Sequence, residues 1–178
     1  MNKSIYLLIL LFSTLSCSSD LDFEQVNDLQ LEPVVVANLA SFDIQANQFV
    51  VGGIEQPVIG DVTDFTLLND PDFTSNLRRI DLFFEFTNTI NRAFVINLYL
   101  LDSNNTRLYT IPFSVPASTG APIVVPKAET FENANLDILK QTKKIAFVVA
   151  LVPGPPLTSS SAGSLKLRSS GTIYFAAQ

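Results

Sequence analysis

The chain has 178 residues, of which 47% are hydrophobic and only 16% are charged, against about 25% charged residues in ordinary soluble domains. Such a chain can bury a core, which excludes wholesale disorder. It contains no histidine, no tryptophan and a single cysteine, which excludes histidine-based catalytic triads, histidine or multi-cysteine metal sites and intramolecular disulfides. The net charge of −6 argues against nucleic acid as a partner, because an acidic surface repels phosphate backbones.

Residues 1–16 have the organisation of a secretory signal. The basic residue Lys3 precedes an apolar run at residues 5–12, and Ser13-Thr14-Leu15-Ser16 follows it. A helix needs about 20 apolar residues to cross the hydrocarbon core, so this run is too short for a stable membrane anchor. We therefore expect residues 1–16 to be a signal peptide that is removed after export.

The only cysteine, Cys17, comes immediately after this leader. Leu15-Ser16-Cys17 resembles the end of the lipobox of bacterial lipoprotein precursors, with Thr14 where that family usually has an aliphatic residue. The resemblance implies that Cys17 becomes the mature N-terminus and carries a covalent lipid, a diacylglycerol thioether with further acyl chains such as palmitate on its amino group. Two or three acyl chains on one cysteine would make membrane attachment effectively permanent. The alternative is a buried free cysteine.

The residues after Cys17 indicate a location. Ser18-Ser19-Asp20-Leu21-Asp22-Phe23-Glu24 is similar to the export signal of Bacteroidota lipoproteins, and an ordinary acidic tether explains the same residues. The whole chain also resembles uncharacterised flavobacterial outer-membrane lipoproteins, a group without known chemistry. The resemblance implies a lipid anchor in the outer membrane, on the cell surface or on the periplasmic face. We expect residues 17–30 to be the lipidated cysteine and a flexible tether, and residues 31–178 to be one domain.

From residue 31 onward, β-branched and aromatic residues recur with the two-residue period of strands, between turns rich in Gly, Pro and Asx. Pro112 cannot donate to a ladder, so the strand that contains it is at an edge or bulged. The expected strands are residues 34–44, 48–51, 63–68, 80–88, 93–101, 107–115, 123–125, 127–131, 145–152 and 164–175. Those at 80–88, 93–101 and 107–115 are expected to form an antiparallel meander. Residues 133–141 are expected to be a short helix or an irregular crossing.

This pattern predicts an all-β fold, an antiparallel β-sandwich of about eight strands with at most one or two short helices, immunoglobulin- or fibronectin-like in outline. The Cys…Trp…Cys hallmark of immunoglobulin domains is absent, so the core must be held by apolar burial, to which the 14 phenylalanines contribute. In residues 164–175 the face with Leu165, Leu167, Ser169, Gly171, Ile173 and Phe175 is expected to be buried.

The sequence offers no catalytic constellation. There is no Gly-x-Ser-x-Gly elbow and no histidine to act as a base, and Ser164 with Lys166 is expected on the wet face of a strand, where the lysine stays protonated. Asp81 and Glu85 would lie about 13 Å apart along one strand, beyond either glycosidase geometry. We therefore expect no enzyme and no cofactor besides the lipid at Cys17.

A calcium site is a further hypothesis. Asp61, Asp64, Asp70 and Asp72 belong to the densest group of oxygen ligands in the chain, and calcium takes about 6 to 8 oxygens. No EF-hand spacing is present, and turns use Asx residues for their own geometry. Turn formation therefore explains the same four aspartates without a metal.

Together these observations predict a lipid-anchored envelope lipoprotein that acts as a non-enzymatic binding or scaffolding module for another envelope component, a protein or a glycan. The alternative is a carbohydrate- or small-ligand-binding surface lipoprotein with a concave apolar groove and exposed Tyr or Phe. Three tyrosines follow the leader, Tyr99, Tyr109 and Tyr174, and packing within strands accounts for them. The apolar loops at residues 153–157 and 117–126 are further candidates for a recognition surface.

Overall fold

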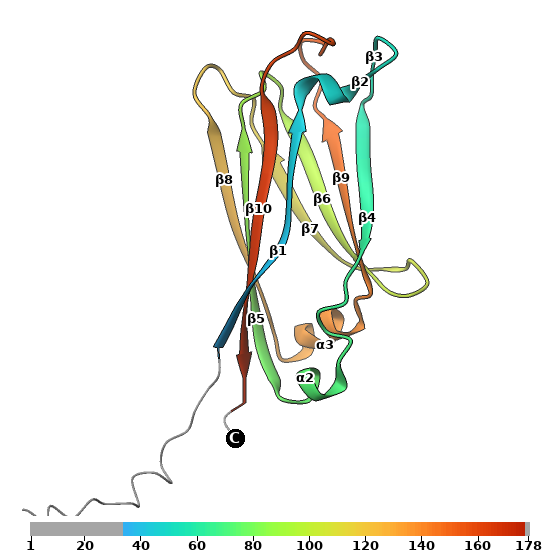
Figure 1. The fold of residues 1–178 in the computed structure, drawn as a ribbon, viewed down its shortest axis with the longest axis vertical. Helices are drawn as coiled ribbons and strands as arrows, with labels where there is room; N and C mark the ends of the chain where they lie inside the picture. The colour runs from blue at the N-terminus through green and yellow to red at the C-terminus, as the bar shows by residue number, and fades with distance from the viewer. Residues whose placement is uncertain (1–33, 177–178) are drawn as a thin grey trace, which may run out of the picture. The chain divides into compact units, whose positions relative to one another are not determined.

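Two four-stranded antiparallel sheets pack face to face in the computed structural model, which describes residues 34–176 (Figure 1). The first sheet has the strand order β1-β10-β5-β8 and the second has the order β4-β9-β6-β7, while β2 and β3 form a small hairpin. The elements are β1 (Val34–Gln45), η2 (Ala46–Phe49), β2 (Val50–Val51), β3 (Ile54–Glu55), β4 (Val58–Asp64), α2 (Pro71–Ser75), β5 (Leu77–Asn88), β6 (Phe94–Leu101), β7 (Arg107–Val115), β8 (Ile123–Glu132), α3 (Ala134–Gln141), β9 (Lys144–Leu151) and β10 (Ser164–Phe175).

The prediction of an antiparallel β-sandwich with few short helices is confirmed. Within that class the connectivity differs from the immunoglobulin-like outline. The eight main strands pair as nested ladders, β1 with β10, β4 with β9, β5 with β8 and β6 with β7, which is the arrangement of a jelly roll. Alternation along a strand indicates which of its faces is buried but not which strand is its neighbour, so the sequence pattern did not separate the two connectivities.

The expected meander over residues 80–115 is wrong, because β5 belongs to one sheet and β6 and β7 to the other. Asn88 ends β5 and is fully buried. Its side-chain nitrogen donates to the carbonyl oxygens of Arg92 (2.8 Å) and Pro116 (2.7 Å), and its side-chain oxygen accepts from the backbone nitrogen of Ile90 at 2.9 Å. These bonds satisfy the backbone of a crossover between the sheets, where the turn residues alone suggested a hairpin.

Several strand boundaries also differ from the prediction. The strand expected at residues 63–68 ends at Asp64 and begins earlier, and the residues after it form a loop that buries Phe65 and Leu68. The segment expected as a strand at 48–51 is divided, because its first two residues end the short 3-10 helix η2 and its last two form strand β2. Residues 123–131 form one continuous strand, since Pro126 occupies an edge position that needs no donor. The helix expected near residues 133–141 is confirmed as α3.

Phenylalanine rings connect the two sheets through the core. Phe86 of β5 packs against Phe113 of β7 with ring centroids 4.8 Å apart, and against Phe42 of β1 at 6.0 Å. Phe42 in turn meets Phe147 of β9 edge to face at 5.8 Å. Burial of each such side chain contributes about 1.5–3 kcal/mol, so apolar packing supplies the core that the absence of disulfides and tryptophan requires.

The face predicted to be buried in β10 is the inner face of the sandwich. Leu165, Leu167 and Ile173 are at most 1% exposed, whereas Lys166 and Arg168 between them are exposed. Pro112 lies on β7, which is an edge strand as predicted. No helix within residues 34–176 is long and apolar enough to cross a membrane.

Candidate functional site

The proposed calcium ligands lie in two separate parts of the described chain. Asp61 and Asp64 are on β4, and Asp70 and Asp72 flank the start of α2. Asp61 accepts a hydrogen bond from the backbone nitrogen of Val62 at 2.8 Å. Among the side chains that the structure describes, no three acidic, histidine or cysteine groups are gathered closely enough to hold a metal ion. The calcium hypothesis therefore gains no support from the geometry.

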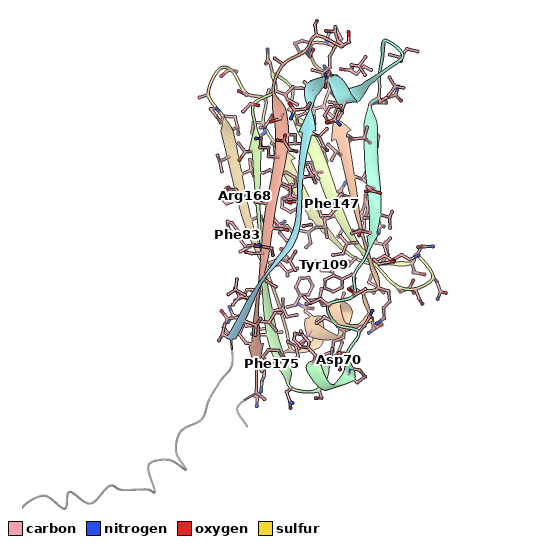
Figure 2. All side chains as sticks on the ribbon, viewed as in Figure 1. Asp70, Phe83, Tyr109, Phe147, Arg168 and Phe175 are labelled. Carbon is pink, nitrogen blue, oxygen red and sulfur yellow. The ribbon has the colours of Figure 1, made fainter. Side chains whose placement is uncertain are left out.

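Asp81 and Glu85 point outward from the first sheet, as expected for solvent-face residues, and each is engaged by an arginine. The Arg79 guanidinium binds the Asp81 carboxylate with two hydrogen bonds of 2.8 and 2.6 Å and, with the Thr130 hydroxyl, holds the pKa of Asp81 below its usual value despite partial burial. Three ion pairs cross this outer face, Arg79–Asp81, Arg168–Glu85 and Lys166–Asp43. We call it the charged face; Arg168 and the half-exposed Phe83 mark it in Figure 2.

The outer face of the second sheet is different. Strand register places side chains from β4, β9, β6 and β7 next to one another in three cross-strand rows, none of them charged. Val58, Val62 and Val95 are 53%, 55% and 42% exposed on it. Charge borders these rows, because Asp64 and Lys144 stand in the next row and the Arg107 guanidinium lies over the Tyr99 ring at 5.4 Å from its centroid. The rows, which we call the uncharged face, are Val58, Ala150, Val95 and Ser114; Gly60, Val148, Asn97 and Pro112; Val62, Ala146, Tyr99 and Thr110.

The tyrosines are used in packing, as the sequence predicted. Tyr109 stacks edge to face on Phe131 and donates its hydroxyl to Glu129 at 2.7 Å. This hydrogen bond, with partial burial, raises the pKa of Tyr109. Tyr99 and Tyr174 lie under arginine guanidinium groups, at 5.4 and 5.2 Å from their ring centroids. None of the three rings forms a free platform for a sugar.

A buried ion pair holds the loop at residues 153–157, one of the candidate recognition loops. The Arg92 side chain is only 6% exposed and its guanidinium lies 3.1 Å from the Glu55 carboxylate of β3. Arg92 also donates to the carbonyl oxygen of Pro155, and Glu55 accepts from the backbone nitrogen of Leu157 at 2.7 Å. The loop is thereby tied to the β2–β3 hairpin, which indicates a structural role for its apolar residues. Sequence reasoning did not identify Arg92 or Glu55, because their pairing joins segments far apart in the chain.

The two lateral edges of the sandwich are built differently. On one side β7 and β8 are joined, because the Lys127 ammonium donates to the Pro112 carbonyl at 3.0 Å and Tyr109 reaches Glu129. On the other side β1 and β4 border two adjoining hollows of about 200 and 450 Å³. Both hollows are lined by Leu39, Ala40, Thr63 and Phe147, and Figure 2 shows Phe147 between β1 and β4. We call this opening the seam groove.

The comparisons with known proteins give only remote similarities. No protein-family model matches the chain, and no curated protein matches it by sequence. Among the solved structures that resemble it is the VP2 subviral particle of infectious bursal disease virus, with 13% identity, a TM-score of 0.44 and coverage of 82% of this chain and 33% of that one. A candidate secreted protein from Parabacteroides distasonis has 16% identity and a TM-score of 0.43, and the match covers 65% of this chain and 37% of that one. Desmodium yellow mottle tymovirus has 12% identity and a TM-score of 0.32, and the match covers 83% of this chain and 90% of that one. The chain thus spans 33% of the length of the first of these structures. Similarities this remote say nothing about function.

Proposed function

We propose that this protein is a lipid-anchored lipoprotein of the outer membrane whose β-sandwich is a non-enzymatic module that binds another envelope protein. The leader and Cys17 support the anchor, and the uncharged face carries the binding role. A chain without histidine lacks the commonest general base, which favours binding over catalysis. The acidic composition of the chain gives no electrostatic attraction to anionic lipid, so the proposal assigns membrane attachment to the lipid alone.

The anchor is tested by Cys17→Ala. We expect this variant to leave the membrane fraction or to retain its leader, whereas Ser19→Ala, two residues away, stays anchored and processed. Mass spectrometry of the native product should find acyl chains on the N-terminal cysteine. An unmodified thiol at Cys17 in the membrane-bound protein would contradict the anchor.

The uncharged face has the composition of an interface rather than of a solvated surface. Interface cores are depleted of charged residues, whereas bulk hydrophobicity alone does not distinguish them. The two outer faces of this sandwich allow a comparison within one molecule, because three ion pairs cover one face and the rows of the other contain no charge. Exposed valines on a flat sheet lose little side-chain entropy when a partner covers them.

The binding role is tested by placing a photo-crosslinking amino acid at Val62 on the uncharged face, with Val124 on the charged face as the control. The two valines are 55% and 52% exposed, so accessibility is matched. In intact cells we expect a discrete crosslinked protein from position 62 and none from position 124. Val58→Lys, on the same face, should abolish the crosslink from position 62. Crosslinks of equal yield from both positions would refute docking at the uncharged face.

The seam groove favours a second candidate function, the binding of a small ligand. It is concave and apolar, and Phe147 lines both of its hollows. Carbohydrate receives less support than an apolar ligand, because Tyr99, Tyr109 and Tyr174 are all occupied by intramolecular contacts.

A further inference from the structure

The seam groove exists because small side chains occupy the inner face of two neighbouring strands. Ser169 and Gly171 follow each other on the inner face of β10, where the flanking inner positions are Leu167 and Ile173. Ala37 of β1 lies directly opposite Gly171 in the ladder. Apolar interiors are normally packed without voids. Ala37 and Ser169 line the smaller hollow, so their small side chains leave room there for another molecule, whereas the Leu39 side chain fills the space beside Gly171.

A bulge in β1 fixes the near wall of this space. The register between β1 and β10 shifts between Asn38 and Ser41. The Ser169 hydroxyl accepts from the backbone nitrogen of Ala40 at 3.0 Å and donates to its carbonyl oxygen at 2.7 Å, so the bulged backbone is satisfied. Leu39 is turned toward Gly171, where a Cβ atom would lie 3.4 Å from its side chain. The wall is therefore held in place by specific bonds.

The floor of the groove is apolar and its mouth is acidic. Leu82, Phe84 and Leu98, which line the smaller hollow, are between 1% and 4% exposed, so the opening to them is narrow. The exposed Asp61 of β4 lines the larger hollow, whereas Asp64 borders the smaller one from the outer row that it shares with Lys144. Neither hollow has a lysine or arginine in its lining. The larger hollow, of about 450 Å³, has the size of a small-molecule site, which is about 300–1,000 Å³, and the smaller one extends it by about 200 Å³.

We propose that the seam groove binds a single-chain lipid with an uncharged head, such as a monoacylglycerol, with its alkyl chain between the sheets and its head at Asp61. A narrow apolar slot fits one alkyl chain and offers no polar lining deep enough for a sugar. A fatty acid or a phosphate head would meet like charge at the mouth. A peptide strand could bind only by pairing with a free sheet edge. The bulge interrupts the edge of β1, and on the edge of β4 the backbone N–H of Val62 already donates to the Asp61 carboxylate.

This inference deepens the small-ligand candidate and does not depend on protein docking at the uncharged face. The test is photo-labelling of the full-length protein in its own membrane with a clickable monoacylglycerol whose alkyl chain carries a diazirine. We expect labelled peptides from β1, β4 and β9. Ala37→Phe on β1 and Thr63→Phe on β4 should each reduce the labelling by about tenfold or more, because each introduced ring occupies the groove. Val36→Phe, the neighbour that is 68% exposed, should label like the wild type.

Resistance to limited proteolysis shows whether each variant is folded, and two filling variants on opposite walls keep the test decisive if one of them fails to fold. A fatty-acid probe with the same diazirine chain should label about tenfold less than the monoacylglycerol, and Asp61→Asn should reduce that difference. Labelling of Ala37→Phe and Thr63→Phe at the wild-type level would overturn the site. Equal labelling by the two probes in the wild type would overturn the assignment of an uncharged head. If position 62 gives no crosslinked protein, the proposed protein docking fails, but the two lipid-labelling results are unaffected.

Discussion

Replacing Glu55 by alanine should destabilise the sandwich far more than removing any exposed acidic partner. Glu55 neutralises the Arg92 guanidinium, whose side chain is 6% exposed, and accepts from the backbone nitrogen of Leu157. Arg92 is left with the carbonyl oxygen of Pro155 when the carboxylate is gone. The variant therefore leaves a positive charge buried without a counter-ion, and it frees a backbone donor.

The magnitude follows from these two losses. Breaking a buried ion pair by removing one partner costs about 3–5 kcal/mol, and a hydrogen bond to a charged group contributes about 1.5–3 kcal/mol. The Glu55 side chain is 25% exposed, so water replaces part of both interactions. We expect a loss of about 3 kcal/mol in the free energy of unfolding, which lowers Tm by about 6–12 °C in a domain of this size. Glu55→Gln keeps an acceptor for Leu157 and should lose about half as much.

The assay is urea unfolding at neutral pH followed by far-UV circular dichroism, since the chain has no tryptophan. Asp43→Ala is the matched control, because Asp43 and Lys166 also form a pair of 3.1 Å but their side chains are 46% and 53% exposed. An exposed pair of this kind contributes about 0–1 kcal/mol. If Glu55→Ala and Asp43→Ala lower the stability equally with unchanged m-values, burial of Arg92 does not determine the strength of its ion pair.

Three further outcomes are expected. The pKa of Asp81 is held down by Arg79, so the stability that this carboxylate contributes is present above its unfolded pKa of about 4 and is lost as pH falls through the lower folded value. Urea unfolding of the wild type and Asp81→Asn should therefore differ at pH 6, and the difference should shrink as the pH falls below the unfolded pKa. Gly163→Ala should lower the free energy of unfolding by about 2 kcal/mol or more, because φ is +98° and a Cβ would lie 2.6 Å from a backbone oxygen. Gly120→Ala, at φ +130° with no atom within 4 Å of the added Cβ, should lower it less in the same urea assay. Asp61→Ala uncovers a backbone N–H on the edge of β4, so it should raise the rate of aggregation measured by light scattering; an unchanged rate would show that Asp61 does not protect this edge.

Much of the strand layout could be predicted from the sequence where one strong local signal was present. The strands at residues 107–115 and 164–175 were predicted with the same bounds as β7 and β10. In the first, Pro112 also predicted a strand that is at an edge or bulged, and the structure has it at an edge. In the second, clean alternation predicted the buried face. Local signals of this kind act over a few residues, so they are independent of the rest of the fold.

The assignment of strands to sheets could not be predicted in the same way. It depends on long-range bonds such as those of buried Asn88, whose side chain reaches the Pro116 carbonyl 28 residues away. The same reasoning applies to the seam groove. Alternation correctly placed Ser169 and Gly171 on the buried face of β10, but only the pairing of Ala37 with Gly171 shows that small residues meet there. The pairing of Arg92 with Glu55 was missed for the same reason.

The uncharged face illustrates how strand order creates a surface that no segment of the sequence contains. One of its rows takes Val62 from β4, Ala146 from β9, Tyr99 from β6 and Thr110 from β7, and along the chain each of these stands in an ordinary strand. A single exposed valine on a strand needs no explanation. Several exposed valines on one face beside the edge strand β4 favour association with another protein. Asp61 accepts a hydrogen bond from one backbone donor of that edge, whereas the rows of the face contain no charged residue of their own and the Arg107 guanidinium reaches over Tyr99. Protection of the edge prevents unspecific strand pairing, while the uncharged rows leave the face available to a docking partner. A surface that avoided all association would be expected to carry charges on the face as well as at the edge.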